Sequence, residues 1–391
     1  MTLLKVQREQ VHSDQSGRVA GIVTTFLLFI CILSVAFYTY MKSINASASP
    51  QDILQILQLA GSRTVKEAQV QYSFDYDSRG KPVFALYDGY IVKCSNDGIL
   101  ALDRNGAVVW SEGLAFNKPM IKTNGKQLLA ADIGGTDIYI IDGSTVKWRE
   151  RLDAAILNAD IGEDGYVTVV TTAKRDNNEV RVFEPHGTEL FRKIIANDFA
   201  VSAVVTPSEH MLAISSISTG AVGAYSKYKF YDIQGKDLAE QSFEENGELL
   251  PLFWYNHDGS LFAAGDRSAA YMDKSGKTVW EKQFTNVVGA GPVGNRYLAV
   301  AAEDHEGVRL ALYTKDGQEF SSGRLSEKPI GLASMKGIIG DYSYDMVHFF
   351  NEKCENIARY SSGSSVQQIG FFDRQQVVVI TDHQVSVISI N

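Results

Sequence analysis

Cysteine and histidine are scarce in this chain, and the few that are present lack the spacing of a metal site. The 391 residues include three cysteines and seven histidines. Cys31, Cys94 and Cys354 lie far apart in the sequence, which excludes a Cys-x-x-Cys motif and a dense disulfide framework. We therefore expect Cys94 and Cys354 to be buried thiols, and we expect no metal site.

Runs of basic residues and catalytic motifs are also absent. Lysine and arginine number 37 against 46 acidic residues, which gives a formal net charge of −9. An acidic chain without a basic run argues against nucleic acid as a partner. No G-x-S-x-G, H-E-x-x-H or phosphate-loop motif occurs, and the histidines are scattered. We expect a protein that is not an enzyme and uses no cofactor.

Charged residues are missing from one long segment near the start of the chain. Residues 21–40 read GIVTTFLLFICILSVAFYTY, which is long enough to cross a bilayer as a helix. Basic residues precede this segment, whereas only Lys42 follows it closely. The positive-inside bias therefore predicts a cytoplasmic tail at 1–20, a single-pass signal anchor at 21–41 and the rest of the chain outside the cell membrane.

A cleaved signal peptide is the alternative, because Ala46-Ser47-Ala48 offers a small-residue cleavage pattern. The apolar run and the leader before it are longer than usual for a signal peptide, and this favours an uncleaved anchor. Residues 42–67 follow as a linker with a short helix. Apolar residues recur at helical spacing in 51–60 (QDILQILQLA), which predicts an amphipathic helix between Pro50 and Gly61.

A short motif recurs along the remainder of the chain. Its clearest copy, residues 97–110, reads DGILALDRNGAVVW: an alternating apolar strand, a turn with glycine, and a second strand that ends in an aromatic. The copies start at residues 97, 134, 177, 225, 267, 307 and 343, at intervals of 36 to 48 residues. A second hairpin pattern lies between the copies, so each unit supplies four strands. This period is typical of four-stranded β-propeller blades.

The last unit is one strand short. Only residues 383–390 follow its hairpin, whereas residues 68–76 alternate well and belong to no other unit. A ring of blades must close, because an open end leaves an unpaired face. We expect 68–76 to become the outermost strand of the last blade, so that 68–391 form an all-β, eight-bladed β-propeller. Seven blades is the alternative, and it requires residues 343–360 to be something other than a blade.

Large aromatic residues follow the turn glycines after four residues, or after five in the case of Trp148. They are Trp110, Trp148, Phe191 and Trp280. Such a repeat could stack a ligand, but a bulky aromatic at one place in each blade also fills the wedge between neighbouring sheets. We expect these four residues to be structural.

The repeat resembles that of pyrroloquinoline-quinone-type propellers, which are similar to WD-type propellers. In that family a strand of the pattern G-x-[LVI]-x-A-[LF]-D precedes an [NT]-G turn and a tryptophan, as in residues 97–110. The resemblance is fair at 267–280, weak elsewhere, and covers 68–391 as architecture. The family includes quinone-dependent dehydrogenases and an eight-bladed lipoprotein that assists outer-membrane protein assembly. With its anchor and single domain, the chain looks more like membrane-tethered propellers of clostridia-like bacteria, a likeness that implies no activity.

Function is expected on the connections between second and third strands, where three segments are long or charged. These segments are 172–178, 218–226 and 303–307. We expect Lys174, Arg175, Tyr225 and His305 to contact a partner, most naturally another envelope or membrane protein. The chain is then a membrane-anchored, extracytoplasmic, non-catalytic scaffold for protein–protein interaction in the cell envelope. The alternatives are a binder of an envelope polysaccharide or small ligand, and a quinone-type enzyme remnant.

Overall fold

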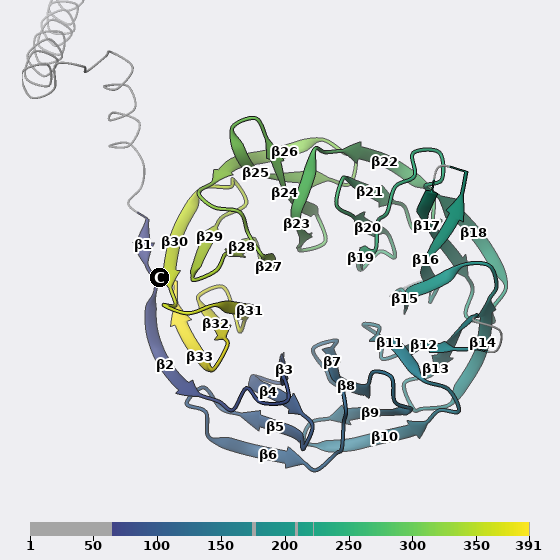
Figure 1. Ribbon diagram of the computed structural model, residues 1–391, viewed down its shortest axis with the longest axis horizontal. Coiled ribbons are helices and arrows are strands. Elements are labelled where there is room, and N and C mark those ends of the chain that lie inside the picture. Colours follow the sequence, from purple (N-terminus) through teal and green to yellow (C-terminus); the bar gives the residue numbers. More distant parts are fainter. Residues whose placement is uncertain (1–64, 174–176, 208–209, 222, 391) are drawn as a thin grey trace, which may run out of the picture. The chain divides into compact units, whose positions relative to one another are not determined.

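The computed structural model describes residues 65–173, 177–207, 210–221 and 223–390. All regular structure in these residues is β-strand, and the 33 strands form eight sheets arranged as a closed ring (Figure 1). The predicted anchor at 21–41 and the predicted helix at 51–60 lie outside the described residues. The chain is therefore an all-β, eight-bladed propeller over the part described, and residues 343–360 contribute to a blade.

Each sheet is an antiparallel meander that begins at the central channel and ends at the outer rim. The first four blades contain these strands in order: β3 (Val83–Tyr87), β4 (Tyr90–Ser95), β5 (Gly98–Leu102) and β6 (Val108–Glu112); β7 (Pro119–Thr123), β8 (Gln127–Asp132), β9 (Asp137–Asp142) and β10 (Thr145–Arg151); β11 (Ile156–Ile161), β12 (Val167–Thr172), β13 (Asn178–Phe183) and β14 (Glu189–Ile195); β15 (Phe199–Val205), β16 (Leu212–Gly220), β17 (Gly223–Tyr231) and β18 (Asp237–Ser242).

The second four blades repeat the same order. They contain β19 (Leu252–Tyr255), β20 (Leu261–Ala264), β21 (Ser268–Met272) and β22 (Thr278–Gln283); β23 (Asn286–Val293), β24 (Tyr297–Asp304), β25 (Gly307–Thr314) and β26 (Glu319–Leu325); β27 (Gly331–Met335), β28 (Ile338–Tyr342), β29 (Met346–Phe350) and β30 (Asn356–Ser361); β31 (Val366–Phe371), β32 (Gln376–Thr381) and β33 (Gln384–Ser389), with β2 (Gln69–Asp75) as the fourth strand of blade 8.

The N-terminal strands join the last two blades. β2 pairs antiparallel with β33, from Gln69 opposite Ser389 to Asp75 opposite Gln384. Just before it, β1 (Lys66–Glu67) pairs parallel with β30 and gives blade 7 a fifth strand. The side chains reinforce this contact, because Arg359 Nε donates to Glu67 Oε1 at 2.5 Å. One continuous stretch of chain therefore covers the outer edges of blades 7 and 8.

The core is divided into eight apolar clusters, one between each pair of neighbouring blades. The cluster between blades 8 and 1, for example, packs Val378 and Val387 against Phe84 and Ile91. The middle strands are buried on both sides, as in the fully buried β8 (QLLAAD), while the outer strands alternate. Burial between blades is therefore what holds the ring together.

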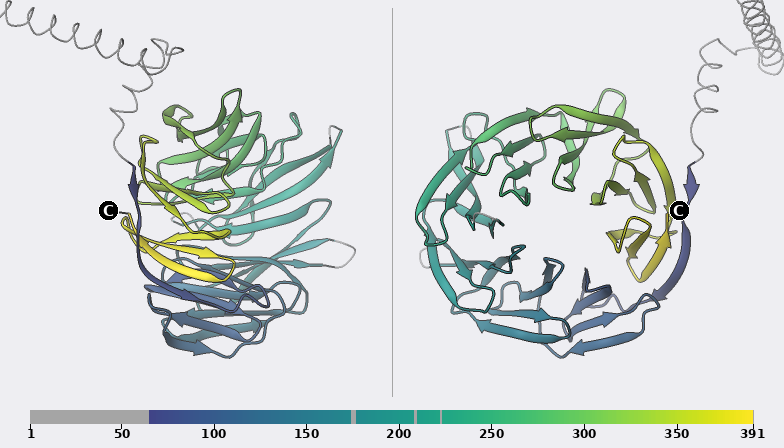
Figure 2. Two further views of the ribbon diagram at one scale, coloured as in Figure 1. Left: turned by 60° about the vertical axis from the view of Figure 1, so that its left-hand side comes forward. Right: turned by 180° about the vertical axis from the view of Figure 1, so that it is seen from behind.

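The ring has two ends, the hairpin face and the turn face, which carry different sets of turns. The hairpin face carries the connections between second and third strands, such as 304–307, and the turn face carries those between first and second strands, such as 256–259. The antiparallel meander places these two sets of turns at opposite ends of every blade. Figure 2 shows, in teal, the long strands β16 and β17 of blade 4, which project beyond the neighbouring blades.

Candidate functional site

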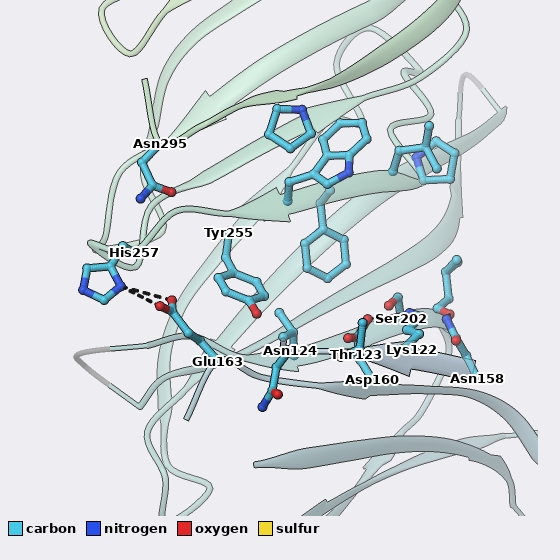
Figure 3. Close-up of a pocket in the computed structure, with 17 residues that line it drawn as sticks. Lys122, Thr123, Asn124, Asn158, Asp160, Glu163, Ser202, Tyr255, His257 and Asn295 are labelled. Carbon is cyan, nitrogen blue, oxygen red and sulfur yellow. Dashed lines mark hydrogen bonds and ion pairs between the residues drawn. The ribbon is translucent and has the colours of Figure 1, made fainter. Parts of the chain in front are cut away.

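A cavity of about 740 Å³ lies in the central channel, between the first strands of blades 2 to 6. These strands are β7, β11, β15, β19 and β23, whose inner edges have no further strand to pair with. The inner edges of these five strands therefore border the channel. Figure 3 shows polar residues of β7 and β11 along one side of this cavity and Tyr255 on the other.

The polar wall is organised by contacts between neighbouring blades. Lys122 Nζ of β7 lies 2.5 Å from Asp160 Oδ2 of β11. Asn158 Nδ2 donates to the Val201 carbonyl of β15 at 2.9 Å. Both contacts hold charged or polar side chains in fixed positions at the channel, where each is only partly buried.

The opposite wall is aromatic. β19 begins after Pro251 and reads LFWY, so that Phe253, Trp254 and Tyr255 follow one another on an innermost strand. Phe253 and Tyr255 pack toward blade 4, Trp254 packs toward blade 6, and all three remain partly exposed at the cavity. Burial, with smaller contributions from the Asp160 and Glu163 carboxylates, raises the pKa of Tyr255 to about 12. The phenol therefore stays neutral at physiological pH.

An ion pair lies at the turn-face end of the cavity. His257 Nδ1 of blade 5 lies 3.0 Å from Glu163 Oε2 of blade 3, so the contact spans blade 4 (Figure 3). This hydrogen bond is the main cause that raises the pKa of His257 above its ordinary value. The neighbouring Asp258 is held by Lys315 Nζ at 2.6 Å.

The hairpin-face end of the channel is apolar. A second cavity of about 380 Å³ lies there, lined by residues of blades 5, 6 and 7 that include Leu252, Val288, Ile330 and Leu332. Leu252 belongs to both cavities. The second cavity is therefore mainly apolar, whereas the turn-face end of the large cavity carries charged groups.

The residues expected to contact a partner do not form one cluster in the described structure. Lys174 and Arg175 lie outside the described residues. Tyr225 is 5% exposed, and the Lys227 ammonium lies 5.7 Å from its ring centroid. His305 is exposed in the turn between β24 and β25, where Arg324 pairs with both Asp304 and Glu306. The binding role of these four residues stays a prediction.

Two of the three segments described as long connections are in fact strands. Pairing of β16 with β17 continues to Gly220 opposite Gly223, and pairing of β24 with β25 continues to Asp304 opposite Gly307. The backbone groups of these strand residues therefore find partners in the ladder rather than in a loop. Gly223 and Gly307 both have a φ of +121°, which a side chain would strain.

The repeated aromatics contact the next blade. The Trp148 indole lies against the turn glycine Gly187 of blade 3 and donates its Nε1–H to the Pro185 carbonyl at 3.1 Å. Trp280 stands in the same relation to Gly317 and the Thr314 carbonyl. Phe191 lies against Gly235, and Trp110 packs in the cluster between blades 1 and 2.

The cavity residues were not predicted from the sequence, although one sequence pattern pointed to them. Three consecutive aromatics on a first strand are unusual for a position that faces a channel, and the run FWY at 253–255 could have pointed to them. The Lys122–Asp160 and Glu163–His257 pairs left no such signal, because each joins residues of different blades. Across residues 65–173, 177–207, 210–221 and 223–390, no cluster of histidine, cysteine and carboxylates could hold a metal ion. Within the same ranges, no helix has the length and hydrophobicity needed to cross a membrane.

The strand order and the central channel define the class of this protein, an eight-bladed β-propeller. Two solved propellers are similar to it over 82% of its length: BamB from Moraxella catarrhalis, with 14% identity, 99% of that chain covered and a TM-score of 0.55, and Sqt1 from Saccharomyces cerevisiae, with 10% identity, 98% covered and a TM-score of 0.61. The chain belongs to the family of unknown function DUF5711, whose model matches residues 61–390. No curated protein matches it.

Proposed function

We propose that this chain is a membrane-anchored, non-catalytic scaffold that binds another envelope protein on its hairpin face, outside the cytoplasm. The observation that carries the proposal is a set of exposed apolar side chains at that face. Phe199 and Leu252 start the first strands of blades 4 and 5, and Ile330 precedes the first strand of blade 7. Tyr344 lies in the turn between β28 and β29 of blade 7. These four residues are called the apolar rim.

The apolar rim differs from the other exposed apolar residues. Its members are 52%, 52%, 59% and 68% exposed, in chain order. The remaining large apolar side chains that the structure describes as exposed lie on outer strands or just before β1, and are therefore distributed around the circumference. A group of exposed apolar residues around one opening is a common mark of a protein-binding surface. Large side chains such as Phe and Tyr supply most of the contact area there.

Support for a non-catalytic role comes from the channel. The charged groups of the large cavity are engaged with one another, Lys122 with Asp160 and His257 with Glu163. These contacts join different blades, which fits a role in holding the channel together. The likeness to BamB and Sqt1 supports the fold on which the proposal builds.

Support for the membrane location comes from the sequence. Residues 21–40 are uncharged and mainly apolar, and basic residues precede them. The motif at 97–110 supports a pyrroloquinoline-quinone-type repeat as the origin of the blades, and the predicted anchor supports kinship with membrane-tethered propellers of clostridia-like bacteria. Protease treatment of intact protoplasts checks the topology, since the propeller should be digested from outside.

The docking proposal is tested by in vivo cross-linking and mass spectrometry on the full-length chain. The test variant combines Phe199→Ser, Ile330→Ser and Tyr344→Ser. The matched control combines Val109→Ser, Val279→Ser and Phe320→Ser, which remove side chains of 48%, 51% and 50% exposure from outer strands. We expect the test variant to lose its cross-linked partner and the control to keep it. Recovery of the same partner by both variants would refute the hairpin face as the docking surface.

A further inference from the structure

The two walls of the large cavity offer different chemistry to one ligand. Amide, hydroxyl and charged groups of β7, β11 and β15 line one side, whereas Phe253 and Tyr255 of β19 line the other, with Tyr255 labelled in Figure 3. The two sides belong to one cavity, since Asp160 of β11 and Tyr255 of β19 both line it. A ligand in the cavity therefore meets hydrogen-bonding groups on one face and aromatic surface on the other.

The charged groups of the cavity have partners within it. Lys122 is paired with Asp160 at 2.5 Å, and Glu163 is paired with His257 at 3.0 Å. An ionic ligand would have to displace one side chain from its pair. The displaced charged side chain would then have to be solvated, and this cost offsets the binding free energy of the ligand. A neutral ligand can accept from Lys122 or donate to Asp160 without breaking the pair, since a carboxylate accepts several hydrogen bonds.

The cavity also has the size and composition of a small-molecule site. Its volume of about 740 Å³ lies in the range of about 300–1,000 Å³ typical of ligand pockets. Ser202 and Asn295 add a hydroxyl and an amide to the lining, and Trp254 adds the largest aromatic surface. These groups suit a molecule that has many hydroxyls along its edge and one apolar face.

We propose that the central cavity binds a neutral saccharide of one or two pyranose rings. The C–H face of a pyranose packs on aromatic side chains, here those of Phe253 and Tyr255 on one face of β19, and its hydroxyls are both donors and acceptors. The hydroxyl edge then faces the Lys122–Asp160 pair and the Ser202 hydroxyl. This site is separate from the apolar rim, except for Leu252, and it does not depend on the docking role.

The proposal is tested by isothermal titration calorimetry on the full-length chain, in a detergent without a sugar headgroup. The probes are maltose, cellobiose and N,N′-diacetylchitobiose as neutral saccharides, with glucuronic acid as the charged comparison. We expect at least one neutral disaccharide to bind, and we expect glucuronic acid to bind more weakly than that disaccharide. No binding by any neutral probe, or tighter binding of glucuronic acid, overturns the proposal.

Two variants place the binding in the cavity. Asp160→Asn removes the carboxylate and should weaken saccharide binding about tenfold, the effect of one lost charge-assisted hydrogen bond. Its matched control is Asp237→Asn, because Asp237 also pairs with a lysine of the adjacent blade, Lys193, but outside the cavity. Tyr255→Phe keeps the ring and should weaken binding by a smaller factor. Unchanged affinity in both cavity variants overturns the proposal.

The two functional proposals can fail separately. The Phe199→Ser, Ile330→Ser and Tyr344→Ser variant leaves every residue that lines the large cavity in place. We therefore expect it to bind the saccharide with unchanged affinity even where it loses its protein partner. A loss of saccharide binding in this variant would contradict the assignment of the site to the large cavity.

Discussion

The contact that closes the ring makes a quantitative prediction at Gly106. This glycine has a φ of +84°, and a Cβ placed on it would lie 2.5 Å from Phe74 Cγ, on the strand that completes blade 8. Gly106→Ala should therefore cost the strain of a left-handed residue, about 1–2 kcal/mol, and also displace the Phe74 ring. Displacing this half-buried ring should cost about 1–2 kcal/mol more, since full burial of a Phe side chain is worth about 1.5–3 kcal/mol.

Gly134 provides the matched control. Its φ is +85°, but an added Cβ would have no heavy atom within 4 Å. Gly134→Ala should therefore cost only the backbone strain of about 1–2 kcal/mol. The free energy of unfolding is measured by urea titration with tryptophan fluorescence for both single variants, for Phe74→Ala, and for Gly106→Ala combined with Phe74→Ala.

Removal of the ring should relieve the clash in the double variant. We expect the two changes to be less than additive by about 1–2 kcal/mol, in the range found for residues in direct contact. Equal costs for Gly106→Ala and Gly134→Ala, or strict additivity with Phe74→Ala, would refute the argument that closure depends on this contact.

Two further predictions concern a pair within blade 7 and a contact between blades 5 and 6. His348 Nδ1 lies 3.3 Å from Asp341 Oδ1 in blade 7, and this contact raises the pKa of His348 above its ordinary value despite burial; Glu327 raises it further and Arg359 opposes it. The contribution of this pair to stability is complete below the unfolded pKa of about 6.5 and is lost as the pH rises through the higher folded pKa. The free energy of unfolding, measured by urea titration, should therefore change less between pH 6 and pH 8 for His348→Gln than for the unmodified chain. Both chains contain the exposed His257, so its effect on this comparison is the same in each. Trp280→Phe removes the indole donor to the Thr314 carbonyl at 3.2 Å but keeps an aromatic ring, as Phe191 does in blade 3. Thermal unfolding should therefore show a loss of only about 0.5–1 kcal/mol in the free energy of unfolding. A larger loss for Trp280→Phe than for Trp280→Ala would contradict this prediction.

The blade architecture was accessible from sequence because it depends on local patterns. Strand alternation, turn glycines and a recurring spacing each act over a few residues, and their repetition predicted eight blades, which the structure confirms. Aspartates before the turns show the same local logic: Asp103 Oδ1 accepts from the backbone N–H groups of Asn105 and Ala107. These features need no knowledge of distant residues.

Features that join distant residues were not accessible. β1 is only two residues long, and its parallel pairing with β30 leaves no alternating pattern. A β-bulge recurs beside the outer turn, for example between Ala101 and Leu102 and between Tyr271 and Met272. It adds a single residue to a strand, and this cannot be recognised in a repeat whose length already varies from blade to blade. The cavity is the strongest example, because its lining comes from five blades and is assembled only when the ring is complete.

The position of β2 has a consequence for the timing of synthesis. Ser73 of β2 and its partner Ser386 of β33 are separated by 313 residues. At the ~5–20 residues per second of ribosomal elongation, β2 waits about 15–60 s for its partner strand. During this interval its backbone groups and the side chains of Val70 and Tyr72 have no native strand to pair with. The strand β2 is thus made early but is among the last to find its partner. Until then, a newly made chain must be protected from pairing this strand with another chain.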